Sequence, residues 1–295
     1  MSERLINEVD LICIDTRQDI SGSIKAIETC LEHFAFKTVK LITNRDIGYK
    51  YQHLIPYDTI RSISDYSKFC VYDLWKYIEG THCLIVQYDG YILNPNTWTD
   101  EWLNLDYIGA NNGAGGNGGF SLRSKKFCKY VSDFYIAEGK NRFHPEDNAY
   151  ASWNHEKFKD SGFVYGDTNQ MHLFSKEHGI WTKQFGFHDN STALKYENKT
   201  LKILEYINCI DEFEFGRVDS DTLNKFWTFK LNTDGFIEGE HHDNETFWKI
   251  NDKGHLIFLD KNNKITTYFN EMKNGMIIGD WLNGGKHYLK VKNDN

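Results

Sequence analysis

Asn111-Asn112-Gly113-Ala114-Gly115-Gly116-Asn117-Gly118-Gly119-Phe120-Ser121-Leu122-Arg123 is the stretch around which the rest of the chain can be arranged. Five of the seven residues from Gly113 to Gly119 are glycine. Glycine adopts positive φ angles without steric cost and lets a ligand approach the main chain, so the cluster indicates either a flexible loop or a place of close contact. The following residues, Phe120 to Arg123, alternate between apolar and polar, which is typical of a strand. We therefore expect a loop between two ordered elements.

A strand-helix-strand unit is predicted near the N-terminus. Residues 9–14 form an apolar run that ends at Asp15-Thr16-Arg17, the pattern of a buried strand that leads into a polar loop. Residues 38–43 form a similar run. Between them, apolar residues recur at helical spacing, which places them on one face: Ile20, Ile24, Ile27, Leu31 and Phe34. The two strands should be parallel and joined by a right-handed crossover.

Residues 62–78 predict a further helix, capped by Ser64 or Asp65. The most apolar strand follows at residues 83–86 and leads into Gln87-Tyr88-Asp89-Gly90. In an open α/β sheet, ligands bind beyond the carboxyl ends of the parallel strands. Residues 15–17, residues 44–46 and Asp89 are therefore expected to share one edge of the sheet.

After the glycine-rich stretch, helices are predicted over residues 125–136 and 146–157. Pro145 suits the position before a helix, and Glu146 and Asp147 would complement the dipole of its first turn, so helix capping is one interpretation of the two acids. From about residue 200, short strands alternate with turn residues, as in antiparallel β structure. We expect two domains, an α/β domain over residues 1–200 and a small β-rich accessory domain over residues 201–295.

Composition excludes several classes of partner. The formal net charge is −8, and no block of Lys and Arg is present, so a nucleic-acid backbone is not an expected ligand. No run of the sequence approaches the roughly 20 apolar residues of a membrane-spanning helix, and residues 1–8 do not resemble a signal peptide. The six cysteines are scattered through apolar segments, as in reduced core residues. These features predict a soluble, cytoplasmic protein.

The order of several short motifs resembles the GT-A glycosyltransferases, and most closely a sparsely characterised group of them. The motifs are Q-x-D-G from Gln87 to Gly90, Y-I-G-A from Tyr107 to Ala110, G-N-G-G-F-S-L-R from Gly116 to Arg123, and P-E-D from Pro145 to Asp147, with Phe185-Gly186-Phe187-His188 further on. Each motif is weak alone, but together and in order they are fairly specific. The resemblance covers residues 9 to 190 and implies a Rossmann-like GT-A domain that binds a nucleotide sugar.

For the diphosphate of such a donor, the resemblance implies a divalent cation. Asp89 would be its carboxylate ligand, and His188 would be a second, late ligand. A histidine, a carboxylate and a diphosphate suit Mn²⁺ better than Mg²⁺. Related enzymes commonly carry D-x-D, whereas Gln87 stands at the first position here and supplies no charge. Gln87 would instead contact ribose or a water on the metal.

The resemblance also implies roles for the glycine stretch and the acids. Asp147 would be the general base of an inverting transfer, and Glu146 would bind acceptor hydroxyls or orient that base. Gly118 and Gly119 would let donor sugar and acceptor approach the backbone, with Ser121 facing the site and Arg123 binding phosphate or an acid.

Three residues at the ends of the first two strands would hold the nucleotide: Thr16, Arg17 and Arg45. For the two arginines, a solvated surface position is the alternative.

These residues together predict a glycosyltransferase of the hexosyltransferase type, with a UDP- or GDP-linked sugar as donor and a glycan or other hydroxyl compound as acceptor. Retention of configuration remains open, because a retaining enzyme could use the same metal site. Two other functions also remain open: a non-catalytic carbohydrate-binding protein and a nucleotidyltransferase. In the C-terminal region, Trp227, Trp248 and Trp281 with Tyr268 either form a sheet core or a platform for carbohydrate.

Overall fold

The fold was analysed in a computed structural model of the chain, which describes residues 4–110, 116–177, 184–188, 212–219, 222–232, 235–251, 255–273 and 275–292. The chain divides into two compact units. The first comprises Met1–Glu177 and Phe185–Ala193, and the second comprises His178–Gln184 and Leu194–Asn295. The domain boundary predicted at residue 200 lies outside the described residues.

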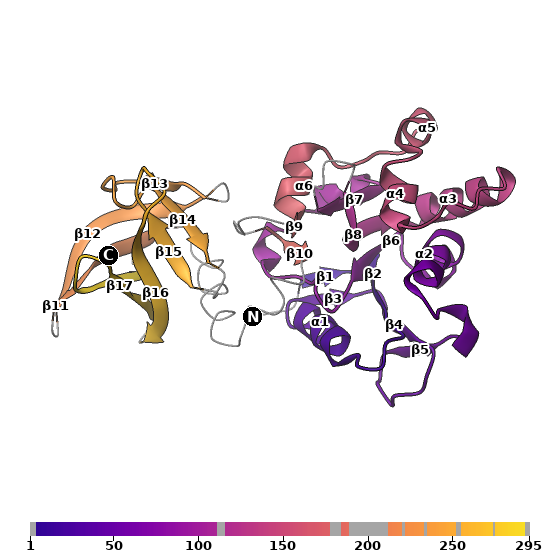
Figure 1. Cartoon of the computed structure of the whole chain (residues 1–295), viewed down its shortest axis with the longest axis horizontal. Helices are drawn as coiled ribbons and strands as arrows, with labels where there is room; N and C mark the ends of the chain where they lie inside the picture. The colour runs from indigo at the N-terminus through magenta and orange to yellow at the C-terminus, as the bar shows by residue number, and fades with distance from the viewer. Residues whose placement is uncertain are drawn as a thin grey trace. The chain divides into compact units, whose positions relative to one another are not determined.

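Within the described part of the first unit, six strands form a mixed sheet in the order β5-β4-β2-β6-β8-β7 (Figure 1). The strands are β2 (Val9–Ile14), β4 (Val39–Thr43), β5 (Gln52–Leu54), β6 (His82–Val86), β7 (Tyr107–Ala110) and β8 (Asn117–Ser124). The first four are parallel, whereas β8 runs antiparallel to both of its neighbours. The predicted parallel strand-helix-strand unit and the mixed α/β class are confirmed.

Two short parallel pairs flank this sheet. β1 (Arg4–Ile6) pairs with β3 (Phe34–Phe36), and β9 (Ser175–Glu177) pairs with β10 (Gly186–His188). In the second pair His188 lies opposite Glu177, which places these two side chains next to each other. Phe34, expected on the preceding helix, instead begins β3, because α1 ends at Leu31.

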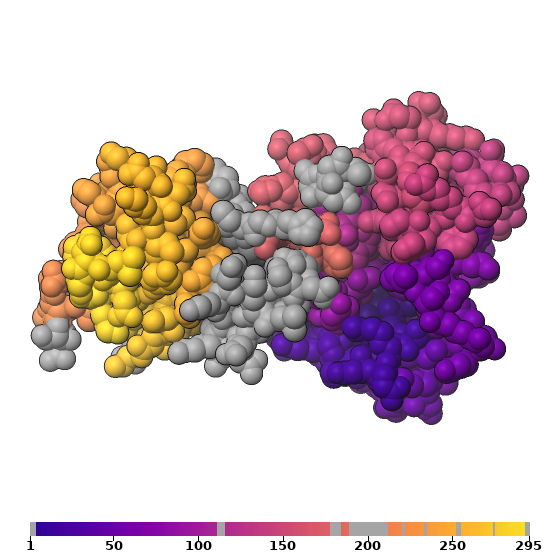
Figure 2. Space-filling model, in the orientation of Figure 1, coloured from indigo at the N-terminus to yellow at the C-terminus, as the bar shows by residue number. Residues whose placement is uncertain are grey.

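The helices cover both faces of the sheet. They are α1 (Ser21–Leu31), α2 (Ile63–Tyr72), α3 (Lys125–Ala137), α4 (Glu146–Ala151), α5 (His155–Asp160) and α6 (Thr168–Phe174), with 3-10 helices at Tyr57–Thr59, Leu74–Tyr77, Pro95–Thr97 and Asp100–Asn104. α2 to α5 supply one core together with Ile12, Ile85 and Tyr107 from the sheet. Figure 2 shows the purple atoms of α2 directly against the pink atoms of α3 and α4. A second, aromatic core joins Trp102, Phe174 and Phe185.

Two helix predictions need correction. Ser62, not Ser64 or Asp65, caps α2, since its hydroxyl accepts from the backbone N–H of Asp65. The helix predicted over residues 146–157 is broken into α4 and α5. The break occurs at Ser152 to Asn154, where residues that favour caps and turns interrupt the helix and the Asn154 amide donates to the Tyr135 hydroxyl at 3.2 Å.

The strand order creates a crevice. From β2 the chain proceeds to β4 and β5 on one side, and then returns to β6 on the other side of β2. Where the order reverses in this way, the loops that follow the two strands diverge, and ligands bind between them at the carboxyl ends. The crevice therefore lies between the segments that follow Ile14 and Val86.

Among the described residues of the second unit, eight strands form an antiparallel sheet in the order β13-β12-β11-β18-β17-β16-β15-β14. They are β11 (Phe213–Asp219), β12 (Thr222–Leu231), β13 (Ile237–Gly239), β14 (Phe247–Ile250), β15 (Leu256–Leu259), β16 (Ile265–Lys273), β17 (Met276–Trp281) and β18 (Lys286–Val291). This confirms the predicted antiparallel structure. Trp248 is a core residue, whereas Trp227, Tyr268 and Trp281 are half-buried.

None of the helices in the described ranges is long and apolar enough to cross a membrane. Five of the six cysteines are buried and unpaired, and the sixth, Cys209, lies outside the described residues.

Candidate active site

A cavity of about 360 Å³ occupies the crevice between β2 and β6. Its lining comes from the end of β2, the loops after β2 and β6, α1, the segment that leads into α2 and the start of α2: Ile14, Asp15, Thr16, Arg17, Ser23, Ile60, Arg61, Ser62, Ile63, Tyr66, Gln87 and Tyr88. This volume lies within the range of small-molecule sites. The predicted residues Thr16, Arg17 and Gln87 thus line one pocket.

Arg17 is fixed at the cavity wall by its neighbours. Its Nε and Nη2 donate to the carboxylate of Asp15 at 3.0 and 2.7 Å, and its guanidinium stacks 3.8 Å from the centre of the Tyr88 ring. The buried carboxylate of Asp15 also accepts from Ser23 Oγ at 2.7 Å. Nearly half of the Arg17 side chain stays exposed, so its remaining donors are accessible to a ligand.

Arg45 and Thr16 contact the protein itself. Arg45 donates to the side chain of Gln18 at 3.1 Å and to the backbone carbonyls of Arg17 and Gln18, so it holds the loop after β2. The hydroxyl of Thr16 donates to the Ile60 carbonyl at 3.3 Å and ties the same loop to the segment before α2. The predicted shared edge therefore exists, but Arg45 does not line the cavity.

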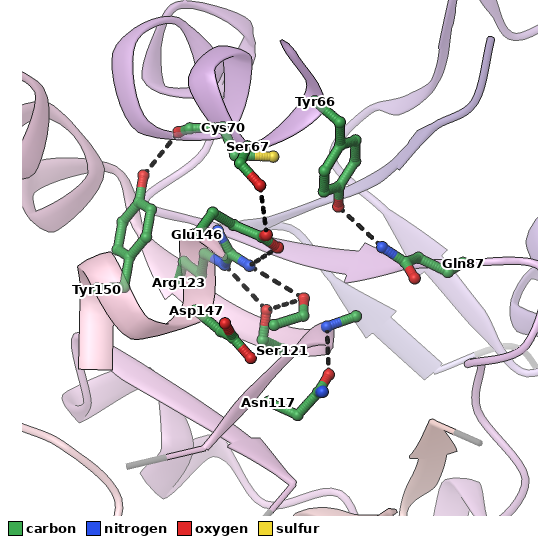
Figure 3. A network of polar contacts seen from close by, with 12 residues as sticks. Tyr66, Ser67, Cys70, Gln87, Asn117, Ser121, Arg123, Glu146, Asp147 and Tyr150 are labelled. Atoms are coloured by element: carbon green, nitrogen blue, oxygen red, sulfur yellow. Dashed lines mark hydrogen bonds and ion pairs between the residues drawn. The ribbon is translucent and has the colours of Figure 1, made fainter. Parts of the chain in front are cut away.

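Gln87 connects this cavity to a second group of residues. Its Nε2 donates to the Tyr66 hydroxyl at 2.9 Å (Figure 3). Its Oε1 lies 3.1 Å from His188 Nε2. The same nitrogen of His188 lies 3.7 Å from Asp89 Oδ1. The structure thus brings His188 to Gln87 and Asp89, although about 100 residues of sequence separate it from them.

The surroundings of His188 contain three buried polar atoms that lack hydrogen bonds within the described ranges. Asp89 Oδ1, His188 Nδ1 and Glu177 Oε2 have no hydrogen-bond partner among the described residues. Buried polar groups are nearly always paired in native proteins, so these atoms indicate a place where a ligand completes the site. Although burial opposes protonation of the ring, Glu177 and the charge of Asp89 raise the pKa of His188 above its ordinary value.

Two glycines bound the ring of His188. A Cβ atom at Gly119 would overlap the ring, 2.7 Å from Cε1 and closer still to Nε2 and Cδ2, and one at Gly90 would lie 3.0 Å from Cδ2. The backbone N–H of Gly119 donates to Asn117 Oδ1, and Asn117 Nδ2 donates to Glu177 Oε1, both at 2.7 Å. The glycine-rich stretch therefore packs directly on the histidine.

The adjacent Gly118 packs on the predicted acids. A Cβ at this position would lie 2.7 Å from Arg123 Nη2, 2.8 Å from Glu146 Oε1 and 3.2 Å from Asp147 Cβ. The backbone of β8 thus contacts the acids at Gly118 and His188 at Gly119. Asn111 to Gly115, the first part of the glycine-rich stretch, lies outside the described residues.

Arg123 organises the acidic side of the site, as Figure 3 shows. It is fully buried, donates to Ser121 Oγ at 2.9 Å and to the Gly118 carbonyl at 3.0 Å, and lies 3.7 Å from Glu146 Oε1. Ser121 is buried too and donates to the same carbonyl at 2.9 Å. Both side chains therefore hold the backbone of Gly118.

Glu146 and Asp147 form the first turn of α4, but their environments differ. Glu146 is buried and accepts from Ser67 Oγ at 3.2 Å. Burial raises the pKa of Glu146 despite the attraction of Arg123, and the charge of Asp147 raises it further. Asp147 is half-buried, and its Oδ1 accepts from the backbone N–H of Asn148 at 2.8 Å. Asp147 is therefore the acid that a substrate can reach.

The sequence interpretation missed several residues of this region. Glu177 was missed because the polar triplet Ser175–Glu177 carries no periodic signal, and only its pairing with β10 brings it to His188. Tyr66 was assigned to the inner face of a helix, although its hydroxyl also faces Gln87. Asp15 was expected at this edge of the sheet, but its hydrogen bonds to Arg17 were not predicted.

Comparison with known proteins leaves the function open. Residues 50–194 match the model of a family described as a protein of unknown function (DUF5672), a range that contains Gln87, Asp89, Gly118, Asp147 and His188. A solved glycosyltransferase involved in the glycosylation of the major capsid of PBCV-1 is similar, with a TM-score of 0.38 and 10% identity over 61% of this chain and 91% of that chain. No curated protein matches the sequence. At this level of similarity, function has to be inferred from the residues of the site.

Proposed function

We propose that this protein is a glycosyltransferase whose first unit is a GT-A-type domain that transfers a sugar from a nucleotide donor to a hydroxyl acceptor. One observation carries the proposal. Gln87 links the cavity between β2 and β6 to Asp89 and His188, and Gly118 and Gly119 link that pair to the acids of α4. A nucleotide sugar has the same order of parts: a nucleoside, a diphosphate and then the sugar at which the acceptor reacts.

The nucleoside is assigned to the cavity. Its two aromatic walls, Tyr66 and Tyr88, can contact a planar base, and the exposed donors of Arg17 can bind ribose or phosphate. Thr16 and Arg45 then act by holding the loop that carries Arg17.

A divalent cation fits between the cavity and the acids. No group of three or more His, Cys, Asp and Glu side chains in the described ranges is placed to hold a metal ion, so the protein would supply only Asp89 and His188 and the donor diphosphate the other ligands. Their facing atoms are 3.7 Å apart, and Asp89 Oδ1 has no hydrogen-bond partner among the described residues, which leaves it available to a cation. When bound, Mn²⁺ or Mg²⁺ would neutralise charge on the departing diphosphate.

Asp147 is proposed as the general base. It is ionisable, half-buried and lies beside the bare backbone of Gly118, where an acceptor hydroxyl can approach. Its carboxylate would take the proton of that hydroxyl as the oxygen attacks the anomeric carbon. Such a base contributes roughly 10² to 10⁴ in rate. Glu146, Arg123 and Ser121 are proposed to position Gly118 and α4, because all three are buried.

The experiment is a donor hydrolysis assay with a panel of UDP- and GDP-sugars in the presence of Mn²⁺. We expect release of a nucleoside diphosphate from one donor class, and loss of that release in Asp147→Asn. Release of pyrophosphate would indicate a nucleotidyltransferase instead. Glycan binding that persists in Asp89→Ala, without nucleotide binding, would indicate a carbohydrate-binding protein.

A further inference from the structure

A second cavity of about 360 Å³ lies in the first unit, and none of its lining residues lines the cavity between β2 and β6. It is bounded by Tyr135 of α3, by the loop that precedes α4 and by the residues that follow α4. The lining is Tyr135, Lys140, Asn141, Arg142, Trp153 and Asn154. The composition is two cations, two amides and two aromatic rings, without a carboxylate.

The two cations of this cavity have no acidic partner in the described part of the chain. No ion pair to Lys140 or Arg142 occurs among the residues that the structure describes. The acids of the neighbouring helical turns have other partners, since Asp133 pairs with Lys129 at 2.6 Å and Glu138 with Lys157 at 3.4 Å. In a chain of net charge −8, uncompensated positive charge at a concave surface attracts anions.

Arg142 is held in a defined orientation. Its guanidinium lies 4.0 Å from the centre of the Trp153 ring. Stacking uses the face of the guanidinium and leaves the N–H groups in its plane available for the two oxygens of an anion. Lys140 is half-buried, with its ammonium group 5.2 Å from the centre of the Phe134 ring. The ring contacts restrict both side chains before a ligand binds.

The inner wall of the cavity is polar and rigid. Asn154 and Tyr135 are 8% and 1% exposed, and the Asn154 amide donates to the Tyr135 hydroxyl at 3.2 Å. This hydrogen bond leaves the carboxamide oxygen of Asn154 as an acceptor and the O–H of Tyr135 as a donor, and both can pair with a ligand hydroxyl. The cavity therefore combines an anion site with a hydroxyl-binding wall.

We propose that this second cavity binds an anionic sugar, either a sugar phosphate or a sugar carboxylate. Arg142 and Lys140 contact the anionic group, and Asn154 and Asn141 contact the hydroxyls. The site is distinct from Asp147, which is not among the residues that line this cavity. The proposal does not rest on the glycosyltransferase function.

The test is isothermal titration of the full chain with glucose 6-phosphate, glucuronate, glucose and inorganic phosphate. We expect glucose 6-phosphate or glucuronate to bind with one-to-one stoichiometry at this cavity, inorganic phosphate more weakly, and glucose not measurably. Arg142→Gln should weaken binding by at least about tenfold, as the loss of a charge-assisted hydrogen bond does. Arg142→Lys keeps the charge but loses the planar guanidinium, so its affinity should lie between those of wild type and Arg142→Gln.

Lys159→Gln is the charge-matched control, because Lys159 is exposed on α5 and does not line the cavity. Binding that is equally unchanged in Arg142→Gln and Lys159→Gln would overturn the proposal, as would the absence of binding by both anionic sugars. If inorganic phosphate binds as tightly as glucose 6-phosphate, the sugar hydroxyls do not contribute to binding, and the proposed hydroxyl contacts are wrong. The relative affinity for glucuronate separates a carboxylate ligand from a phosphate ligand.

Discussion

Replacement of Gly119 by alanine tests whether the His188 ring needs a residue without a side chain at this position. The new Cβ would lie 2.7 Å from Cε1 of the ring and closer to two other ring atoms. Carbon atoms are ordinarily about 3.5–4.0 Å apart, so the ring would have to move by roughly 1 Å. Gly90 also lies against the ring, since a Cβ atom built there would lie 3.0 Å from Cδ2.

The expected cost follows from this overlap. Forcing an extra methyl group into a packed site costs about 1–3 kcal/mol of the free energy of unfolding. Displacement of the ring would also move Nε2 away from Asp89 Oδ1, now at 3.7 Å, and from Gln87 Oε1, now at 3.1 Å. We therefore expect Gly119→Ala to lose both stability and any binding of Mn²⁺.

The assay is urea unfolding of four proteins: wild type, Gly119→Ala, His188→Ala and the double variant. If the ring is the obstacle, the added methyl group costs little in the His188→Ala background, and the coupling energy between the two sites is about 1–3 kcal/mol. Gly139→Ala is the control. Gly139 has φ of 59° with no atom near its Cβ position, so alanine there costs backbone strain alone and leaves Mn²⁺ binding unchanged.

Two results would refute this reasoning. One is a Gly119→Ala variant that is as stable as wild type and binds Mn²⁺ equally well. The other is a cost of Gly119→Ala that is the same with and without the His188 ring, since the overlap with that ring would then be irrelevant.

Other predictions concern the two sides of the site. Burial raises the pKa of Glu146, so the stability that this residue contributes is complete below its unfolded pKa of about 4.3 and is lost as the pH rises through the raised pKa. In urea unfolding from pH 4 to 8, the free energy of unfolding of wild type should therefore fall relative to that of Glu146→Gln. Arg123→Met leaves the buried Glu146 without its cation and should cost about 3–5 kcal/mol at pH 7, and a loss below 1 kcal/mol in the same unfolding assay would contradict this. Arg17→Gln should weaken UDP or GDP binding about tenfold in calorimetry, with Lys159→Gln unchanged.

Much of the first unit could be predicted because each central strand coincides with a local run of apolar residues. Apolar runs at residues 9–14 and 83–86 predict two central strands. The rule for ligand sites in parallel sheets predicts residues 15–17 at one edge with Asp89, and Asp15 to Arg17 do line the cavity there. Contacts that depend on pairing between distant segments were not predictable from the runs themselves. Asp89 and His188 meet because β10 bonds to the segment that follows Asp89, where the Leu93 N–H donates to the Phe185 carbonyl at 2.9 Å and Ile92 bridges to Gly186. The pairing of β10 with β9 brings Glu177 to the same histidine.

Side-chain burial was the other limit. Ser121 was expected to face the site, and Arg123 to bind either phosphate or an acid. Both are buried and bind the Gly118 carbonyl, and Arg123 pairs with the acid Glu146. Alternation along a strand tells which residues share a face, but not whether that face is covered. The cover is α4, whose first turn brings Glu146 to Arg123 across 23 residues of sequence.

The central claim is that the crevice binds a nucleotide sugar and the acids of α4 act on it. The most direct measurement is the release of nucleoside diphosphate from a panel of nucleotide sugars, with Mn²⁺ or with EDTA, by wild type and Asp147→Asn. We predict release from at least one UDP- or GDP-sugar by wild type, abolished by EDTA and reduced about 10²-fold or more in Asp147→Asn. Absence of release from every donor, or equal release by Asp147→Asn, would contradict the claim.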